Sequence, residues 1–356
     1  MRKIKFIIII GIILLNNNKL NAQLTDLITG VDGPYGIAFS GNYLYVSVGN
    51  LDKISKIDFT AANPTITDVV TGLNGPDGLA VNGNYLYIAE YSGNKISKID
   101  LTASNPVPID VITGVNGPVA LIFIGNDLYI GVNNEQKIAK INVLDSTPTL
   151  TTVININQIL GSTYARNGND LYIPIENKIS KIDISSPNPT LVDVITEIDS
   201  PGSLALNGNI LYFSHWGNVS KISKIDINSV TPTVTDITTA VNGPYGLALN
   251  GNDLYISEWI GDKISKLANG SLGDSNPVIR YQISLYPNPA EEYIQIKNFE
   301  PTSTFIIYDI LGQKVHDGNI AYDQKIDIQK LSYGTYYIKI NELTTLKFIK
   351  KQPLLN

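Results

Sequence analysis

Short apolar runs separated by turn residues repeat along most of the chain. A typical stretch is GPDGLAVNGNYLYIAEYSGNKISKID at Gly75 to Asp100, which holds an apolar run, a Gly/Asn turn, the run LYIA and then KISKID. Gly and Asn accept the positive φ that a tight hairpin requires. A proline such as Pro106 then precedes a further apolar run, as at the start of an outer strand. Each stretch therefore predicts four short antiparallel strands.

The same pattern occurs six times. Its Leu-Tyr pair recurs at spacings of 42, 42, 43, 40 and 43 residues. The leucines of these pairs are Leu44, Leu86, Leu128, Leu171, Leu211 and Leu254. Four-stranded units of about 40–45 residues are typical of β-propellers. The fold class predicted is all-β, with a six-bladed β-propeller.

The sixth copy ends one strand early, at Leu267. A matching strand stands before the first copy, because LTDLITG at Leu24 to Gly30 resembles the fourth-strand run TITDVVTG at Thr65 to Gly72. We predict that this N-terminal strand completes the last blade and closes the ring, which leaves no long open edge. An open right-handed solenoid is the alternative, and it would not need the displaced strand.

The repeated phrase resembles that of the NHL and SMP-30-like six-bladed propellers. The shared pattern is Pro-Gly before an apolar strand, then Gly-Asn, then Tyr-Val-x-Asp/Glu, then Asn-x-x-Ile, and the resemblance covers about residues 24–267. It implies the propeller fold and says little about chemistry. The fourth copy departs from the pattern because it lacks the opening Gly-Pro, which leaves the entry loop of that blade unassigned.

After a polar stretch, ANGSLGDSNPV, the repeat gives way to strand-like runs that predict a small antiparallel β-sandwich. This tail resembles the type A C-terminal sorting domain of the type IX secretion system of Gram-negative bacteria. The matching phrases are SLYPNPAEEYIQI, IIYDILGQKV, IDIQKLSYGTYYIKI and LKFIKK. The resemblance implies Sec export, the type IX machinery as a partner, and passage through the outer membrane. In that family the domain is usually removed, and the cargo is anchored to surface polysaccharide or released.

The first residues, MRKIKFIIIIGIILLNNNKLNA, have the basic start and apolar run of an export signal. Ten apolar residues are too few to span a bilayer, although a signal anchor is the alternative. The predicted organisation is a signal peptide at 1–22, the propeller at 23–269, a linker at 270–281 and the sorting domain at 282–356. The expected location is the cell surface or the medium of a Gram-negative bacterium, and the chain is not expected to be an integral membrane protein.

Composition and charge limit the kinds of molecule that the chain is expected to bind. Hydrophobic residues make up 43% of the chain and charged ones 16%, as in folded domains. Residues 23–274 hold 13 Lys and Arg against 24 Asp and Glu, a net charge of −11 that argues against nucleic acid or an anionic membrane as the partner. Cysteine does not occur, so disulfides and thiol chemistry are excluded.

In a four-stranded antiparallel sheet, the entry to the first strand and the loop after the second strand lie at the same end. Equivalent positions of the repeat, here called frames, carry different residues from copy to copy at these two places. They place aromatic and acidic residues on contiguous blades, and the two tryptophans of the chain share one frame. Aromatic rings beside carboxylates suit sugars or cationic groups. The predicted ligand-binding residues are Tyr35, Asp77, Glu90, Tyr91, His215, Trp216, Tyr245, Glu258 and Trp259.

Structural roles for some of these residues stay open. Trp216 and Trp259 could instead cover the packing between blades. Glu90 and Glu258 occupy the acidic position of the NHL pattern, which often binds loop amides, and His215 fits a packing or hydrogen-bonding role better than a catalytic one.

The function predicted is that of an exported binding module for a glycan, a small ligand or a protein. A metal-dependent hydrolase of the SMP-30/gluconolactonase type is the first alternative, and a structural surface component is the second. No catalytic residue is assigned, because the chain has no phosphate-binding glycine loop, no His-x-x-x-His pair and no GxSxG motif. No cofactor is expected. Only the hydrolase alternative would use Ca²⁺ or another divalent cation, held by Asp77, Glu90 and Glu258.

Overall fold

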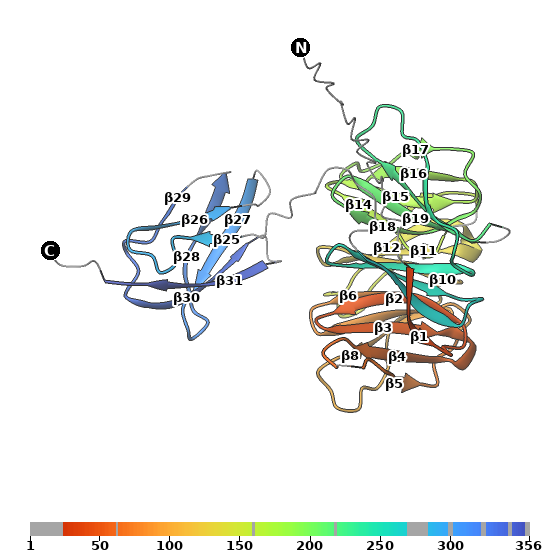
Figure 1. The fold of residues 1–356 in the computed structure, drawn as a ribbon, viewed down its shortest axis with the longest axis horizontal. Helices are drawn as coiled ribbons and strands as arrows, with labels where there is room; N and C mark the ends of the chain where they lie inside the picture. The colour runs from red at the N-terminus through yellow and green to blue at the C-terminus, as the bar shows by residue number, and fades with distance from the viewer. Residues whose placement is uncertain are drawn as a thin grey trace, which may run out of the picture. The chain divides into compact units, whose positions relative to one another are not determined.

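The computed structural model describes residues 24–61, 63–158, 161–216, 219–268, 284–297, 302–321, 325–340 and 344–352. The chain forms two compact units, Met1–Gly273 and Asp274–Asn356. The described residues of both are built from β-strands (Figure 1). Two short 3₁₀ helices also occur among the described residues, η1 (Gly49–Leu51) and η2 (Asn133–Glu135). The predicted signal peptide and linker lie outside the described residues.

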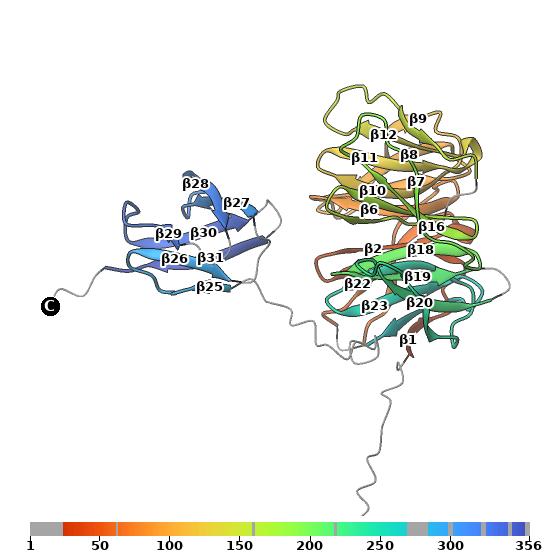
Figure 2. The same cartoon turned by 90° about the horizontal axis from the view of Figure 1, so that it is seen from above.

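The described part of the first unit consists of six four-stranded antiparallel sheets (Figures 1 and 2). Sheet 1 is β2 (Pro34–Ser40), β3 (Tyr43–Val48), β4 (Lys53–Asp58) and β5 (Ile66–Thr71). Sheet 2 is β6 (Pro76–Asn82), β7 (Tyr85–Glu90), β8 (Lys95–Asp100) and β9 (Ile109–Thr113). Sheet 3 is β10 (Pro118–Ile124), β11 (Asp127–Val132), β12 (Lys137–Asn142) and β13 (Thr151–Asn155).

The other three sheets repeat this order. Sheet 4 is β14 (Ala165–Asn167), β15 (Asp170–Ile175), β16 (Lys178–Asp183) and β17 (Val192–Ile195). Sheet 5 is β18 (Pro201–Asn207), β19 (Ile210–His215), β20 (Lys221–Asp226) and β21 (Thr235–Thr238). Sheet 6 is β22 (Pro244–Asn250), β23 (Asp253–Glu258), β24 (Lys263–Leu267) and β1 (Leu24–Thr29).

The repeated residues form strands for the reasons that the sequence indicates. The leucine of the Leu-Tyr pair is fully buried in every sheet, and the KISKID strand buries both isoleucines while its lysines stay partly exposed. The hairpin turn between the first two strands has a glycine at positive φ, such as Gly41 (58°) in sheet 1 and Gly83 (58°) in sheet 2. The second and third strands therefore form the apolar layer between neighbouring sheets.

The strand from the start of the chain completes sheet 6, as predicted. β1 pairs antiparallel with β24, with Thr25 opposite Lys266 and a register shift between Asp26 and Ile28. Asp26 accepts hydrogen bonds from the Lys263 ammonium (2.8 Å) and the Ser265 hydroxyl (3.2 Å).

The same contacts recur in sheet 1. There Asp68 on β5 pairs with Lys53 (2.8 Å) and accepts from the Ser55 hydroxyl (2.9 Å). β1 therefore repeats the contacts of a fourth strand, although it comes from the other end of the unit.

Neighbouring sheets meet at their first strands. β2 contacts β6 on one side and β22 on the other, and β22 also contacts β18 (Figure 2). The Ser47 hydroxyl accepts from the Gly36 amide (2.8 Å) and donates to the carbonyl oxygen of Asp77 in sheet 2 (2.6 Å). A Cβ on Gly36 would lie 2.4 Å from that oxygen, so this close approach of two strands requires glycine.

Sheet 4 departs from the pattern, because its copy of the repeat has no proline at the position that Pro34 and Pro201 occupy in other copies. Its first strand, β14, has three residues where the others have seven. The residues before β14 make backbone hydrogen bonds instead of extending the strand. The Gly161 amide donates to the carbonyl of Pro174 (2.9 Å), and the Ser162 amide donates to the carbonyl of Gly202 (2.8 Å).

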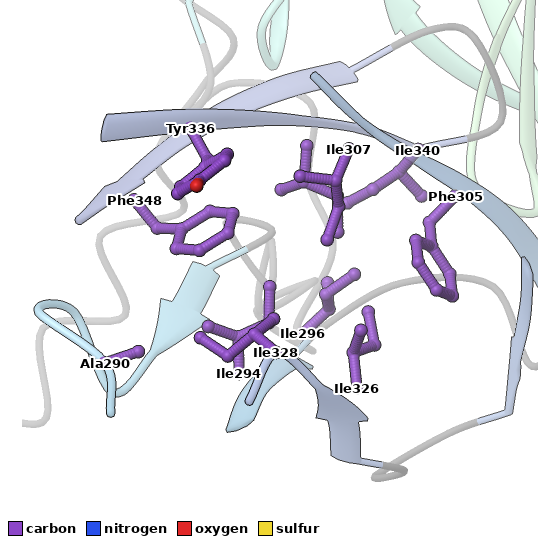
Figure 3. Close-up of a cluster of buried hydrophobic side chains, with 11 residues drawn as sticks. Ala290, Ile294, Ile296, Phe305, Ile307, Ile326, Ile328, Tyr336, Ile340 and Phe348 are labelled. Atoms are coloured by element: carbon purple, nitrogen blue, oxygen red, sulfur yellow. The ribbon is translucent and has the colours of Figure 1, made fainter. Parts of the chain in front are cut away.

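The second unit contains two antiparallel sheets that share one core. One sheet is β25 (Ser284–Tyr286), β26 (Tyr293–Lys297) and β29 (Lys325–Asp327), and the other is β28 (Lys314–Ala321), β27 (Thr302–Tyr308), β30 (Gly334–Ile340) and β31 (Thr344–Lys350). Isoleucines of β26 and β29 pack against aromatic and aliphatic residues of β27, β30 and β31 (Figure 3). The rings of Tyr336 and Phe348 stack at 5.5 Å within this core.

Truncating Ile28 tests the closing strand. The side chain is 9% exposed and packs with core residues of sheets 1 and 6, so Ile28→Ala should lower the free energy of unfolding by about 2–4 kcal/mol. Thermal denaturation should show a melting temperature lower by several degrees. Thr25→Ala, on the exposed side of the same strand, is the control and should leave it nearly unchanged. Equal melting temperatures for wild type and Ile28→Ala would contradict the pairing.

Candidate functional site

The first unit contains a cavity of about 560 Å³ lined by first-strand residues and by the loops after the second strands. Six of the nine predicted ligand-binding residues line it, namely Tyr35, Asp77, Tyr91, Trp216, Tyr245 and Trp259. They come from sheets 1, 2, 5 and 6. The repeat frames therefore bring residues that lie far apart in the sequence to one cavity.

Aromatic rings form much of the wall. The Tyr35 ring meets the Tyr245 ring edge-on at 4.8 Å and lies 6.2 Å from the Trp259 ring at a tilt of 36°. Trp216 is 46% exposed and Trp259 is 41% exposed. Because both indoles remain so exposed, they have ring surface available for a ligand.

Asp77 is the acidic group of the cavity. It is 7% exposed, and its Oδ2 accepts a hydrogen bond from the Tyr245 hydroxyl at 2.9 Å. Its Oδ1 has no hydrogen-bond partner among the described residues. Burial raises the pKa of Asp77 from 3.8 to about 7, although the Tyr245 hydrogen bond acts in the opposite direction.

The tyrosines around Asp77 stay neutral at physiological pH. Burial, and then the negative charge of Asp77, raise the pKa of Tyr35 and of Tyr245 above the ordinary tyrosine value. Their hydroxyls therefore remain hydrogen-bond donors toward Asp77 or a ligand.

Glu90 and Glu258 lie outside the lining of this cavity, contrary to the expectation that they face a ligand. Both are buried, at 1% and 0% exposed. The Oε2 of Glu90 accepts from the Asn74 amide (2.9 Å), and that of Glu258 accepts from the Asn242 amide (2.6 Å). Each carboxylate therefore fixes the loop that leads into the first strand of its own sheet.

His215 also lies outside the cavity lining. The ring is buried, with Nδ1 2.6 Å from the carbonyl oxygen of Asp199 and Nε2 2.9 Å from the Ser223 hydroxyl. Burial lowers its pKa. His215 and Trp216 occupy adjacent positions of the repeat, and successive residues of an extended chain point to opposite faces, so Trp216 lines the cavity whereas His215 is buried.

Several other residues that line the cavity were not predicted. Asn50, Ser92 and Ile260 each follow the tryptophan frame by one position, and Ser162 shares the frame of Asp77. Extending the frame by one residue would have found the first three. A second cavity of about 400 Å³ shares Trp216 and contains Glu176 and Asp199.

The residues present do not fit the metal site of the hydrolase alternative. Glu90 and Glu258 bond to loop amides, which leaves Asp77 as the carboxylate of the cavity. Across the described ranges, no group of three or more His, Cys, Asp or Glu side chains could hold a metal ion. The three proposed oxygen ligands are therefore not gathered at one point.

Residues 284–352 match the protein family described as the secretion system C-terminal sorting domain. The second unit carries a type IX sorting domain. The chain is therefore exported to the cell surface or secreted. The described part contains no helix with the length and apolar character needed to cross a membrane. No curated protein matches the chain.

Solved structures resemble a large part of the chain. One is virginiamycin B lyase of Staphylococcus aureus with quinupristin (19% identity, TM-score 0.51, 78% of this chain and 95% of that one). Another is a luciferin-regenerating enzyme (9% identity, TM-score 0.57, 69% of this chain and 95% of that one). A third is a gluconolactonase-like protein (10% identity, TM-score 0.56, 69% of this chain and 91% of that one). At these identities the likeness shows the fold alone, which is that of a β-propeller.

Asp77→Asn should stabilise the protein most at alkaline pH. The pKa of Asp77 is about 7 in the folded state and 3.8 ordinarily, so the folded state holds this proton more tightly than the unfolded state. The stability that the bound proton provides is fully present below pH 3.8 and is lost as the pH rises through 7. The whole loss is about 4 kcal/mol, at 1.36 kcal/mol per pKa unit.

Melting temperatures of wild type and variant at about pH 5 and about pH 8.5 measure the effect. The advantage of the variant should grow with pH. Asp68→Asn is the control, because a lysine partner lowers the pKa of Asp68 and the carboxylate stays ionised at both pH values. A pH-independent advantage would show that Asp77 does not titrate in this range.

Proposed function

We propose that the chain is a surface-displayed or released six-bladed β-propeller that binds a ligand in the cavity around Asp77, and that the sorting domain delivers it. One observation carries the binding role. The cavity combines half-exposed indoles with a buried carboxylate oxygen that has no hydrogen-bond partner among the described residues. Ligand sites commonly pair an apolar wall with few polar groups in this way.

The six sheets support a closed ring of six blades. β2 contacts the first strands of both sheet 2 and sheet 6, so the succession of sheets returns to its beginning. β1 supplies the fourth strand of sheet 6. The two sheets of the second unit, with their single core, support the small β-sandwich.

The proposed organisation is a signal peptide at 1–22, the propeller at 23–269, a linker at 270–281 and the sorting domain at 282–356. The division of the chain into two compact units supports a cargo and a separate sorting module. The type IX machinery would engage the second, and the propeller would act after delivery.

The exposure of the indoles supports binding over a packing role. A tryptophan that only sealed the contact between sheets would be largely covered, whereas Trp216 and Trp259 are each more than two-fifths exposed. The cavity volume of about 560 Å³ suits a sugar or a small organic molecule. The separation of Asp77 from Glu90 and Glu258 gives the hydrolase alternative no support.

Removing both indoles tests the proposal. The two tryptophans of the chain both line the cavity, so intrinsic fluorescence reports ligand binding there. A panel of glycans and small organic molecules, screened this way against the chain from Leu24 onward, should give ligands that change the emission. Trp216→Ala with Trp259→Ala should then weaken their binding at least tenfold by calorimetry, because each aromatic contact supplies about 0.5–1.5 kcal/mol beyond its buried area and about 1.4 kcal/mol is a tenfold change in affinity.

The control is Tyr85→Ala. This ring is 37% exposed but lies against Lys98 and outside the cavity lining. Its removal should leave affinity unchanged. Full binding by the double tryptophan variant, with an unaltered melting temperature, would assign the two indoles to the scaffold and refute the proposal.

A further inference from the structure

The cavity has an acidic character that comes from one residue. Among the described residues that line it, Asp77 is the one carboxylate, and no Lys, Arg or His is present. The remaining polar groups are neutral amides and hydroxyls, such as Asn50 and Ser92. No protein cation in the lining therefore compensates the charge of an ionised Asp77.

The two oxygens of Asp77 are in different situations. Oδ2 accepts a hydrogen bond from the Tyr245 hydroxyl, whereas Oδ1 is buried and finds no partner in the described part of the chain. A buried, unpaired carboxylate oxygen is unfavourable unless a donor or a cation reaches it. The backbone cannot move Oδ1 away easily, because the carbonyl of Asp77 accepts the Ser47 hydroxyl of sheet 1.

We propose that the cavity binds a primary ammonium group, which donates to Asp77 Oδ1 beside the rings of Tyr35, Tyr245 and Trp259. The inference rests on the proposed function and names the ligand class for the same cavity. A quaternary ammonium would carry the charge but has no N–H for Oδ1. A neutral hydroxyl would donate to Oδ1 but would leave the charge unpaired. A primary ammonium meets both requirements, and ring faces attract cations.

The surroundings of Asp77 make such binding depend on pH. Tyr35 on β2 and Tyr245 on β22 are the titratable groups that interact with it, and both stay neutral. On β10 the lining residue is Val119, and Glu90 on β7 is turned toward the Asn74 amide. With the pKa of Asp77 at about 7, the carboxylate needed for an ammonium forms above that pH.

Cyclohexylamine and cyclohexanol are matched probes, because they share a ring and differ in the ammonium group. Each is titrated into the chain from Leu24 onward, with tryptophan fluorescence and calorimetry as readouts. At about pH 8.5 the amine should bind at least tenfold more tightly than the alcohol. At about pH 5.5 its affinity should fall roughly tenfold as Asp77 takes up a proton, whereas that of the alcohol should stay constant.

Two variants assign the effect to Asp77. Asp77→Asn should bring the ratio of amine to alcohol affinity toward one and remove the pH dependence of amine binding. Asp68→Asn is the control and should leave the ratio and the pH dependence unchanged. Tyr245→Phe removes a hydrogen bond that lowers the pKa of Asp77, so the midpoint of amine binding should move to higher pH.

Equal affinities of the two probes, absence of amine binding, or an amine preference that survives Asp77→Asn would each overturn the ammonium site. The proposed function fails by a different result, namely full ligand binding without Trp216 and Trp259. If neutral ligands bind through the two indoles and the amine is not preferred, the binding module is therefore kept and the ammonium site is rejected.

Discussion

The antiparallel pairing of β1 with β24 is the contact on which the rest of the first unit depends. Sheet 6 has three strands from its own repeat, and the fourth comes from the start of the chain. Asp26 reproduces toward Lys263 and Ser265 the contacts that Asp68 makes in sheet 1. The pairing thus fixes the end of the repeat array to its beginning and covers the edge of β24.

This closure also builds the candidate site. Tyr35 belongs to sheet 1, whereas Tyr245 and Trp259 belong to sheet 6, so their ring contacts exist because these two sheets are neighbours. The Ser257 hydroxyl donates to the carbonyl of Tyr35 and accepts from the Gly246 amide, and so joins the two first strands. The bond from Tyr245 to Asp77 then connects sheets 6 and 2, on either side of sheet 1. The unpaired Oδ1 is thereby held in place before any ligand arrives.

The fold could be predicted from the sequence because the pattern is repeated. Six copies define the strands, the turns and the missing fourth strand. Repetition also located Trp216 and Trp259, since a residue that differs from its equivalents stands out. The frames could not tell which face of a strand a side chain takes, so Glu90, Glu258 and His215 were included with their neighbours. Nor does a single sequence show that Asp77 is nearly buried with one oxygen unpaired, because that depends on Tyr245, 168 residues away.

Cysteine cross-linking tests the ring closure most directly, because the chain has no cysteine of its own. Thr25 and Lys266 are register partners, and opposite residues of antiparallel strands lie close enough for a disulfide. Thr25→Cys with Lys266→Cys should form a reducible intramolecular link that changes mobility on a denaturing gel. Thr25→Cys with Lys140→Cys, which lies in sheet 3, should not. No link in the first pair, or equal linking in both, would contradict the closed ring.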